Sequence, residues 1–266
     1  MTCAAAEWPD LALRFLGVGN AQARELGCAA AVLEQPNDPW LLIDCGPGIV
    51  EAYLAAYGTL PGALFITHVH LDHIGGLENL FYRLATATPS APLTRLFVPA
   101  PLVTLLQSRL ADYPNPLAEG GVNFWDAFQL IPVSERFWLR DQRFSVFAAR
   151  HHDDRSAFGL ALAGAFLFSG DTRPIPEVIG RLAVHGEWIF HDCSSQRNPA
   201  HTGVEELTVE YRAEQCARLA LYHYESAAAG ERLARQGFRV VHPGERCALF
   251  PRPAGACREP IPANAG

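Results

Sequence analysis

The chain has 266 residues, of which 49% are hydrophobic and 18% are charged, and its formal net charge is −7. This length suffices for one large core and is short for two enzyme domains, so we expect a single domain over residues 1–266. All 21 basic residues are arginines, and the acidic balance argues against a nucleic-acid polymer as substrate, because phosphate contacts need a basic surface.

Short apolar runs predict strands in the first part of the chain. We expect strands over residues 11–16, 28–34, 40–43 and 63–66, with helices over 49–57 and 77–84. Residues 85–135 are rich in proline, and there we predict one strand over 96–98 and one helix over 102–110. The spacing of Phe124, Trp125 and Phe128 is more typical of a core than of a binding pocket, so we assign them no role.

The second half alternates strands and helices. We predict two strands over 137–149 joined by a polar turn at 140–142, a strand pair over 158–162 and 165–168, strands over 188–190 and 219–222, and a helix centred on Leu207. A closing hairpin would pair 237–241 with 247–250, and residues 251–266 would form a loose tail. This order predicts mixed sheets covered by helices.

Cysteine usage and the apolar segments bear on the cellular compartment. The seven cysteines are irregularly spaced, which fits free thiols in a reducing cytosol better than a disulfide framework. Residues 1–10 lack a basic n-region, and no apolar stretch is long enough to span a membrane. We therefore expect a cytoplasmic protein without a membrane partner.

Residues 67–76 read THVHLDHIGG and hold four potential metal ligands: His68, His70, Asp72 and His73. An apolar run precedes them and a glycine pair follows, so the loop leaves a strand end, where a rigid scaffold meets solvent. Imidazole suits zinc, and carboxylate adds a charged oxygen ligand. The first two histidines would lean to one side of an extended segment, and the other two ligands would face a second ion. A polar loop with incidental histidines is the alternative.

Further potential ligands also follow short apolar strands. These are His151 and His152, then Asp171, then His223. Because the sheets of an α/β protein deliver side chains to a shared edge, ligands that are distant in sequence can converge there. The pattern predicts a metal site independently of any single motif.

The run THVHLDHIGG resembles the signature loop of the metallo-β-lactamase superfamily. The resemblance implies an α/β fold, a four-layer αβ/βα sandwich with two mixed β-sheets. It also implies a binuclear site for two divalent metal ions, with zinc favoured and manganese or iron as alternatives. Asp44 would support the metal loop from behind; the alternative role for Asp44 is a helix N-cap.

The resemblance also assigns the ligands residue by residue. The first ion would be held by His68, His70 and one of His151 and His152; the second by Asp72, His73 and His223; and Asp171, in the run SGDT, would bridge them. The spacing leaves open which of the two neighbouring histidines is the ligand. His242 is the alternative to His223, which could instead be a buried strand histidine.

An aspartate at the bridging position departs from the β-lactam-hydrolysing branch, which has a cysteine there. Two ions bridged by a carboxylate and a hydroxide suit phosphodiester hydrolysis, with a metal-bound hydroxide as nucleophile and Asp72 as its orienting group. Residues 15–20 (FLGVGN) and 200–202 (AHT) resemble the ribonuclease Z-like phosphodiesterases. His201 would be the general acid, with Asp192 as its helper. Otherwise His201 is a helix-entry histidine beside a capping threonine.

Only 52 positions (223 − 171) separate Asp171 from His223, which leaves no room for a long tRNA-gripping arm. We therefore expect a small-molecule substrate, a compact phosphodiester such as a cyclic nucleotide. Four arginines near the expected edge could clamp its phosphate: Arg150, Arg155, Arg173 and Arg197. The rival functions are hydrolysis of a lactone, lactam or thioester, and a non-enzymatic metal-stabilised binding module. The sequence does not fix the oligomeric state, and a homodimer is left open.

Overall fold

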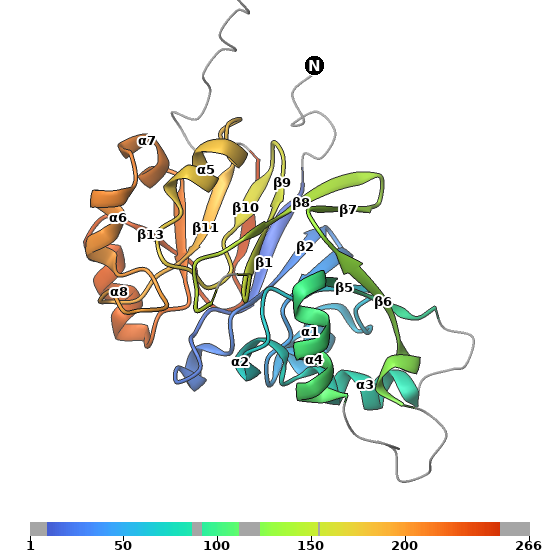
Figure 1. Cartoon of the computed structure of the whole chain (residues 1–266). Helices are drawn as coiled ribbons and strands as arrows, with labels where there is room; N and C mark the ends of the chain where they lie inside the picture. The colour runs from blue at the N-terminus through green and yellow to red at the C-terminus, as the bar shows by residue number, and fades with distance from the viewer. Residues whose placement is uncertain (1–9, 87–91, 112–122, 154, 251–266) are drawn as a thin grey trace, which may run out of the picture.

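The protein is described by a computed structural model that covers residues 10–86, 92–111, 123–153 and 155–250. Two seven-stranded sheets pack against each other, and helices cover their outer sides (Figure 1). This arrangement confirms the predicted α/β class with two mixed sheets. The predicted tail, 251–266, lies outside the described residues.

The first sheet has the strand order β14-β1-β2-β3-β4-β5-β6. Its strands are β1 (Ala12–Gly17), β2 (Ala30–Gln35), β3 (Asp38–Ile43), β4 (Ala63–Phe65), β5 (Thr94–Pro99), β6 (Phe128–Val133) and β14 (Arg246–Ala248). Pairing is antiparallel from β14 to β3 and parallel from β3 to β6. The sequence did not predict β6, because Pro132 interrupts it; at a sheet edge, proline removes no ladder hydrogen bond that the sheet needs.

The second sheet has the order β13-β12-β11-β10-β9-β8-β7. Its strands are β7 (Arg136–Leu139), β8 (Gln142–Ala148), β9 (Phe158–Leu162), β10 (Phe166–Phe168), β11 (Trp188–Asp192), β12 (Leu219–Tyr222) and β13 (Arg239–Val240). Pairing is antiparallel from β7 to β10 and parallel from β10 to β13. The turn between β7 and β8 has positive φ at Arg140 and Asp141, as a two-residue hairpin turn requires, which confirms that predicted turn.

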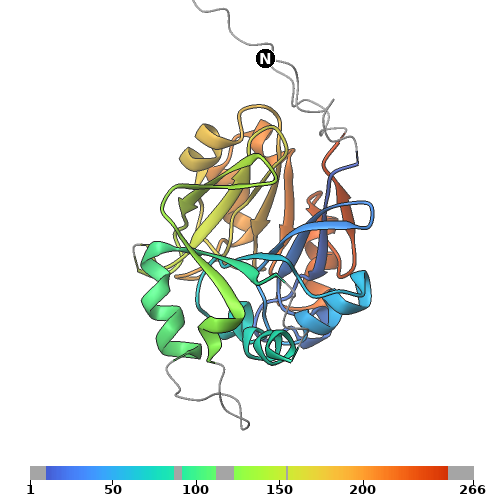
Figure 2. The same cartoon turned by 90° about the vertical axis from the view of Figure 1, so that its right-hand side faces the viewer.

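The helices divide between the two halves of the molecule. On the first half lie α1 (Ile49–Tyr57), α3 (Leu77–Ala85) and α4 (Val103–Leu110), and on the second lie α5 (Pro176–Leu182), α6 (Val204–Glu210), α7 (Ala213–Cys216) and α8 (Ala227–Arg235). In Figure 2 the helices of the first half face the viewer. The short α2 (Leu71–Ile74) belongs to the predicted metal loop. No helix within the described residues is long and apolar enough to cross a membrane.

Aromatic side chains fill the space between the sheets. Phe15 of β1 packs against Phe168, Phe190 and Tyr222 of the second sheet, with ring centroids 6.3, 5.3 and 5.8 Å away, and all four are buried. Such rings contribute large apolar areas to a core. The contact holds the two sheets in a fixed relation, and therefore also the loops that they carry.

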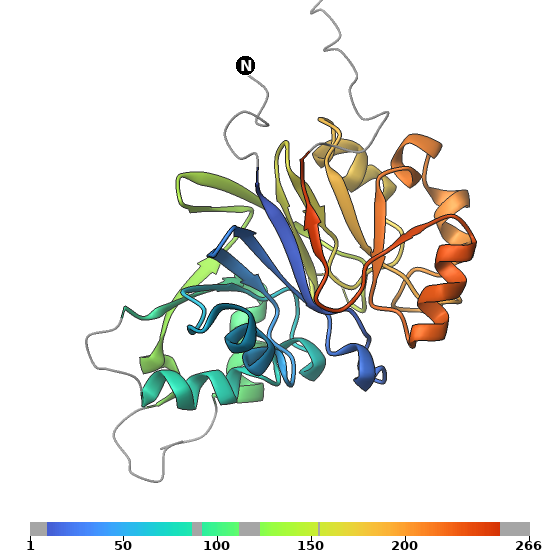
Figure 3. The same cartoon turned by 180° about the vertical axis from the view of Figure 1, so that it is seen from behind.

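The predicted hairpin of residues 237–241 with 247–250 is wrong. Strand β13 pairs with β12 in the second sheet, whereas β14 pairs with β1 in the first, so the chain crosses between the sheets. Figure 3 shows β14 beside β1. The turn bonds to β1 as well, because Gly244 N donates to Phe15 O and Phe15 N donates to Glu245 O. The residues of the turn predicted that the chain reverses there, but not which strands β13 and β14 pair with.

Candidate metal centre

The ends of the parallel strands carry the candidate ligands. Asp44 follows β3, the loop with α2 follows β4, Asp171 follows β10, Asp192 ends β11, and His223 follows β12. Parallel strands present their carboxyl ends at one edge of a sheet, so these side chains meet between the two sheets. Of the side chains that the strand-end pattern selected, the structure brings together His68, His70, His151, Asp171 and His223, whereas His152 lies outside the groups.

The first group joins His68, His70, His151 and Asp171, whose ligand atoms lie within 4.8 Å of one another. His70 Nδ1 is 3.0 Å from His68 Nε2 and 3.2 Å from His151 Nε2. The opposite nitrogens of two rings are already bound: His151 Nδ1 is 2.9 Å from Ala200 O, and His68 Nδ1 is 3.1 Å from Thr67 Oγ1. If both rings donate there, their Nε2 lone pairs point into the group.

The protonation of these rings also suits a metal. Burial lowers the pKa of His68 well below its usual value and lowers the pKa of His151 to about 4, and it lowers the pKa of His70 as well. All three are therefore neutral imidazoles near pH 7, the form that binds metal ions. Converging neutral nitrogen lone pairs repel one another unless a cation lies between them.

The second group joins Asp72, His73 and His223. Asp171 Oδ2 is 3.3 Å from both His73 Nε2 and His223 Nε2, and it is 3.6 Å from His68 Nε2 of the first group. Among the described side chains, His73 Nε2, His223 Nε2 and Asp171 Oδ1 are buried without a hydrogen-bond partner. Unpartnered buried polar atoms of this kind are costly, and a metal ion would satisfy them. The chemistry of these donor atoms therefore fits a metal site.

The carboxylates around the second group favour positive charge at its two histidines. Burial lowers the pKa of His73, but the carboxylates of Asp171 and Asp44 outweigh it and raise that pKa well above its usual value. Burial likewise lowers the pKa of His223, and the same Asp171 charge helps to raise it to about 10. Protons or metal ions can supply this positive charge.

Asp44 supports the loop from behind, as the sequence predicted. Its side chain accepts hydrogen bonds from Thr67 N (2.8 Å) and Thr67 Oγ1 (2.6 Å), and His73 Nδ1 lies 2.8 Å from Asp44 Oδ2. The residue is fully buried and has a φ of 62°. A carboxylate that binds the far nitrogen of a ligand histidine fixes the orientation of the ring and leaves Nε2 free for metal.

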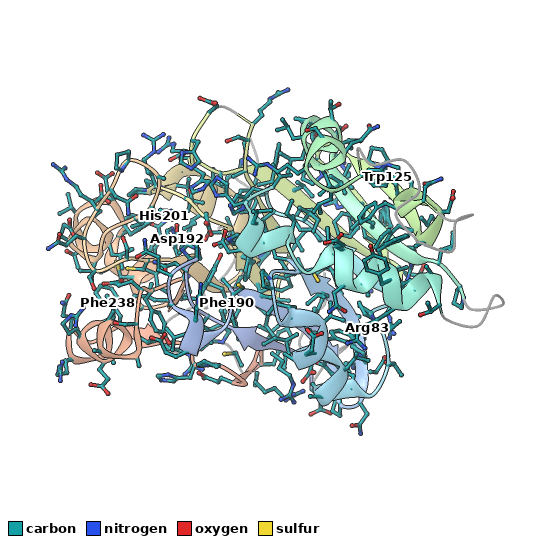
Figure 4. All side chains as sticks on the ribbon, turned by 90° about the horizontal axis from the view of Figure 1, so that it is seen from below. Arg83, Trp125, Phe190, Asp192, His201 and Phe238 are labelled. Atoms are coloured by element: carbon teal, nitrogen blue, oxygen red, sulfur yellow. The ribbon has the colours of Figure 1, made fainter. Side chains whose placement is uncertain are left out.

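His201 and Asp192 form a pair, and with Asp171 and His223 they make a third group of potential metal ligands. His201 Nδ1 is 2.8 Å from Asp192 Oδ2, and Thr172 N donates to the same oxygen at 2.8 Å. Asp192 Oδ1 is 3.4 Å from His223 Nδ1, and the rings of His201 and His223 stack with centroids 5.0 Å apart. Figure 4 shows His201 and Asp192 next to each other, far from Arg83 and Trp125. One carboxylate therefore positions both a candidate ligand and a candidate acid.

The structure separates the two neighbouring histidines. His151 is buried in the first group, whereas His152 is exposed and belongs to none of the potential metal groups found among the described residues. His242 is likewise exposed and outside them. The contact that places His151, its bond to the carbonyl of Ala200, is a backbone contact across 49 residues and leaves no pattern in the sequence.

The arginines expected to clamp a phosphate make different contacts in the structure. Arg150 pairs with Glu177 at 2.9 Å and donates to Pro174 O, and Arg173 donates to Arg150 O. Arg155 lines a separate groove.

Gly46 allows the close approach of the metal loop, and its replacement by alanine is expected to destabilise the protein. A Cβ atom there would lie 1.9 Å from Asp72 O and 2.6 Å from Cys28 Cβ, so α2 would have to move. We expect a loss of about 3 kcal/mol in the free energy of unfolding, measured by urea denaturation. Gly62→Ala is the control, because its Cβ would meet no atom within 4 Å. Equal stability of the two variants would contradict the close approach.

The fold and the histidine and aspartate groups at its edge define a metal-dependent hydrolase of the metallo-β-lactamase superfamily. The crystal structure of the metallo-β-lactamase fold protein YhfI from Bacillus subtilis is similar, with a TM-score of 0.69, 12% identity, and coverage of 89% of this chain and 98% of that one. A diphosphatase of the PhnP family is also similar, with a TM-score of 0.70, 18% identity, and coverage of 90% and 99%.

The chain belongs to the family described as Anti-Pycsar protein Apyc1, which matches residues 11–246. An Anti-Pycsar protein Apyc1 from Bacillus phage 010DV004 is 30% identical over 237 residues, which cover 80% of this chain and 88% of that protein. The predicted superfamily is thereby confirmed, together with the predicted metal-dependent hydrolase.

Proposed function

We propose that the protein hydrolyses a small phosphodiester, such as a cyclic nucleotide, with two divalent ions, zinc being favoured. The observation that carries the proposal is the His201–Asp192 pair beside the metal groups, with His201 Nδ1 4.0 Å from Asp171 Oδ2. Hydrolysis of an ester with a poor leaving group needs a proton donor on the departing oxygen, and this pair is built to supply one.

Seven side chains would hold the ions. His68, His70 and His151 would hold the first, Asp72, His73 and His223 the second, and Asp171 would bind both. When bound, the ions would lower the pKa of a water molecule and stabilise charge on the phosphoryl oxygens. Asp72 is 14% exposed at its side chain, so it faces the open side and can also orient that water molecule.

His201 would donate its proton from Nε2, because Nδ1 is bound to Asp192. Burial lowers the pKa of His201, but the hydrogen bond to Asp192 and the charges of Asp192 and Asp171 outweigh it and raise this pKa above its usual value. A raised pKa keeps the imidazolium populated near neutral pH, as a general acid requires. The side chain is 22% exposed, so it can reach a bound substrate.

The compactness of the protein favours a small substrate over a polymer. Between Asp171 and His223 the chain folds into α5, β11, α6, α7 and their loops, and no long arm projects from this segment. The net charge of −7 also disfavours a long polyanion.

We further propose a cytoplasmic location. The cysteines described in residues 10–250 are all free: Cys28, Cys45, Cys193, Cys216 and Cys247. Free thiols are usual in a reducing compartment. The homodimer and the single domain over 1–266 remain predictions.

The proposed function is tested by metal analysis coupled to a substrate panel. Protein expressed with ample metal is expected to bind about two ions per chain and to hydrolyse bis-p-nitrophenyl phosphate and 3′,5′-cyclic nucleotides. Chelation should abolish both activities and lower the melting temperature. Lactones, lactams and thioesters are the comparison substrates. Activity on acyl substrates alone, or fewer than one ion per chain, would overturn the proposal.

A further inference from the structure

A groove lies mainly on the second half of the molecule, and Ala100 and Pro101 of the first half complete its lining. This groove, of about 690 Å³, is bounded by β8, the residues around the start of β7, the segment 155–158 and the end of α5. None of its lining residues belongs to the potential metal groups among the described residues. Its volume is in the range of sites that bind small organic ligands, about 300–1,000 Å³.

Arginines form the rim of the groove. Arg136, Arg143, Arg155 and Arg181 line it, and Glu135 is the one acidic residue among the lining residues, so the lining carries a charge of +3 (4 − 1). Glu135 pairs with Arg136 at 3.4 Å. Within the described part of the chain, the other three arginines make no ion pair. In a protein with a net charge of −7, such a concentration of free guanidinium groups attracts anions.

The floor of the groove is apolar. Phe147 and Phe158 line it, and each retains a small exposed area, 5% and 6%. Val146 and Val178 extend the apolar lining. Aromatic edges and valines accept a flat apolar ring, and guanidinium groups bind phosphate oxygens in a fork. Together they match a ligand with an aromatic ring and a phosphate.

The backbone at Arg155 supports a binding role for this side chain. Its φ is 59°, in the left-handed region that favours glycine, and Ser156 N closes the turn by donating to Asp153 O. A non-glycine residue in this conformation is strained, and such strain is found more often where a side chain has a function. The turn presents Arg155 to the groove at the end of the segment that begins with His151.

We propose that this groove is a second anion-binding site, which takes a nucleoside monophosphate or an organic phosphate of the same build. The phosphate lies among Arg143, Arg155 and Arg181, and the base lies on Phe147 and Phe158. None of its lining residues is a candidate metal ligand, and the proposal does not depend on the reaction proposed for the metal centre.

The test uses the metal-loaded protein and 8-azidoadenosine 5′-monophosphate as a photoaffinity probe. Label is expected in peptides from residues 134–148 or 178–182. The double variant Arg143→Gln/Arg181→Gln should lose this label, and the Kd for AMP at the groove should rise about tenfold or more. Both arginines are exposed and unpaired within the described residues, so the variant should fold normally and keep its phosphodiesterase activity.

The matched control is Arg109→Gln/Arg235→Gln, which removes the same charge from exposed positions outside the groove. Label confined to the metal loop, residues 67–76, would overturn the proposal. So would an equal loss of label in the control, because that result would reflect net charge alone. Binding of polyglutamate without labelling by the nucleotide would overturn it in favour of an acidic protein segment.

Discussion

Asp171→Ala is expected to reduce kcat by about 10³-fold or more while leaving substrate binding partly intact. Asp171 Oδ2 lies within 3.6 Å of ring nitrogens from both groups, and it is the residue that would bind both ions. Its loss would leave His73 and His223 without their main counter-charge, so we expect a lower metal content as well. Steady-state kinetics, substrate binding and metal analysis of the same preparation measure these effects.

Two control variants distinguish the loss of the Asp171 charge from a general loss of folding. Asp171→Asn keeps the volume of the side chain and removes its charge, so it should lose activity nearly as strongly. Glu231→Ala removes one acidic group from an exposed position on α8 and should be active. Normal turnover by Asp171→Ala with a full complement of metal would show that this residue does not bridge the site.

His201→Ala is expected to affect substrates according to their leaving groups. For a cyclic nucleotide, whose leaving oxygen is a sugar alkoxide, kcat should fall by about 10²–10⁴-fold. For bis-p-nitrophenyl phosphate the loss should be under about tenfold, because p-nitrophenolate departs without a proton donor. Comparison of kcat for the two substrates isolates the proton transfer from any general damage to the site.

The same comparison of kcat for the two substrates tests Asp192, the residue expected to assist His201. Asp192→Asn should reproduce the leaving-group dependence and should also weaken metal binding, because Asp192 is 3.4 Å from His223. His242→Ala is the matched control, since His242 is exposed and outside the metal groups. Equal losses for both substrates in His201→Ala would assign this histidine to structure or binding and not to proton transfer.

The sequence predicted helices and strands best where apolar residues recur at regular spacing without interruption. The helix over 49–57 and the strands over 158–162 and 219–222 have the predicted limits. Helices α5, α7 and α8 were not predicted; α5 begins at Pro176, and α7 has only four residues. For α8 the alanine-rich sequence has little apolar contrast, although Ser226 caps it by accepting from Ala229 N. The swap of β13 and β14 between sheets has no local signal, because pairing partners are decided by the whole fold.

The convergence of most candidate side chains was predictable from the sequence, but their individual contacts were not. The strand-end positions of His68, Asp171 and His223 followed from the sequence, since apolar runs mark strands and polar residues mark their ends. The burial of His151, with His152 exposed, accompanies a contact of His151 with the carbonyl of Ala200, and the link of Asp192 to His223 depends on the parallel register of β11 and β12. Register and backbone contacts arise only when the chain is folded.

The return of β14 to the first sheet has a consequence for how the chain folds. Ala12 pairs with Ala248, and Arg246 Nε binds Glu34 at 2.8 Å, so the N-terminal sheet acquires its last strand from the opposite end of the sequence. During synthesis, β1 therefore waits as an unpaired edge while more than 200 later residues emerge. Contacts of such long range slow folding, and an unpaired edge strand invites association with other chains. This edge of β1 therefore stays open to association with other chains until β14 has been synthesised.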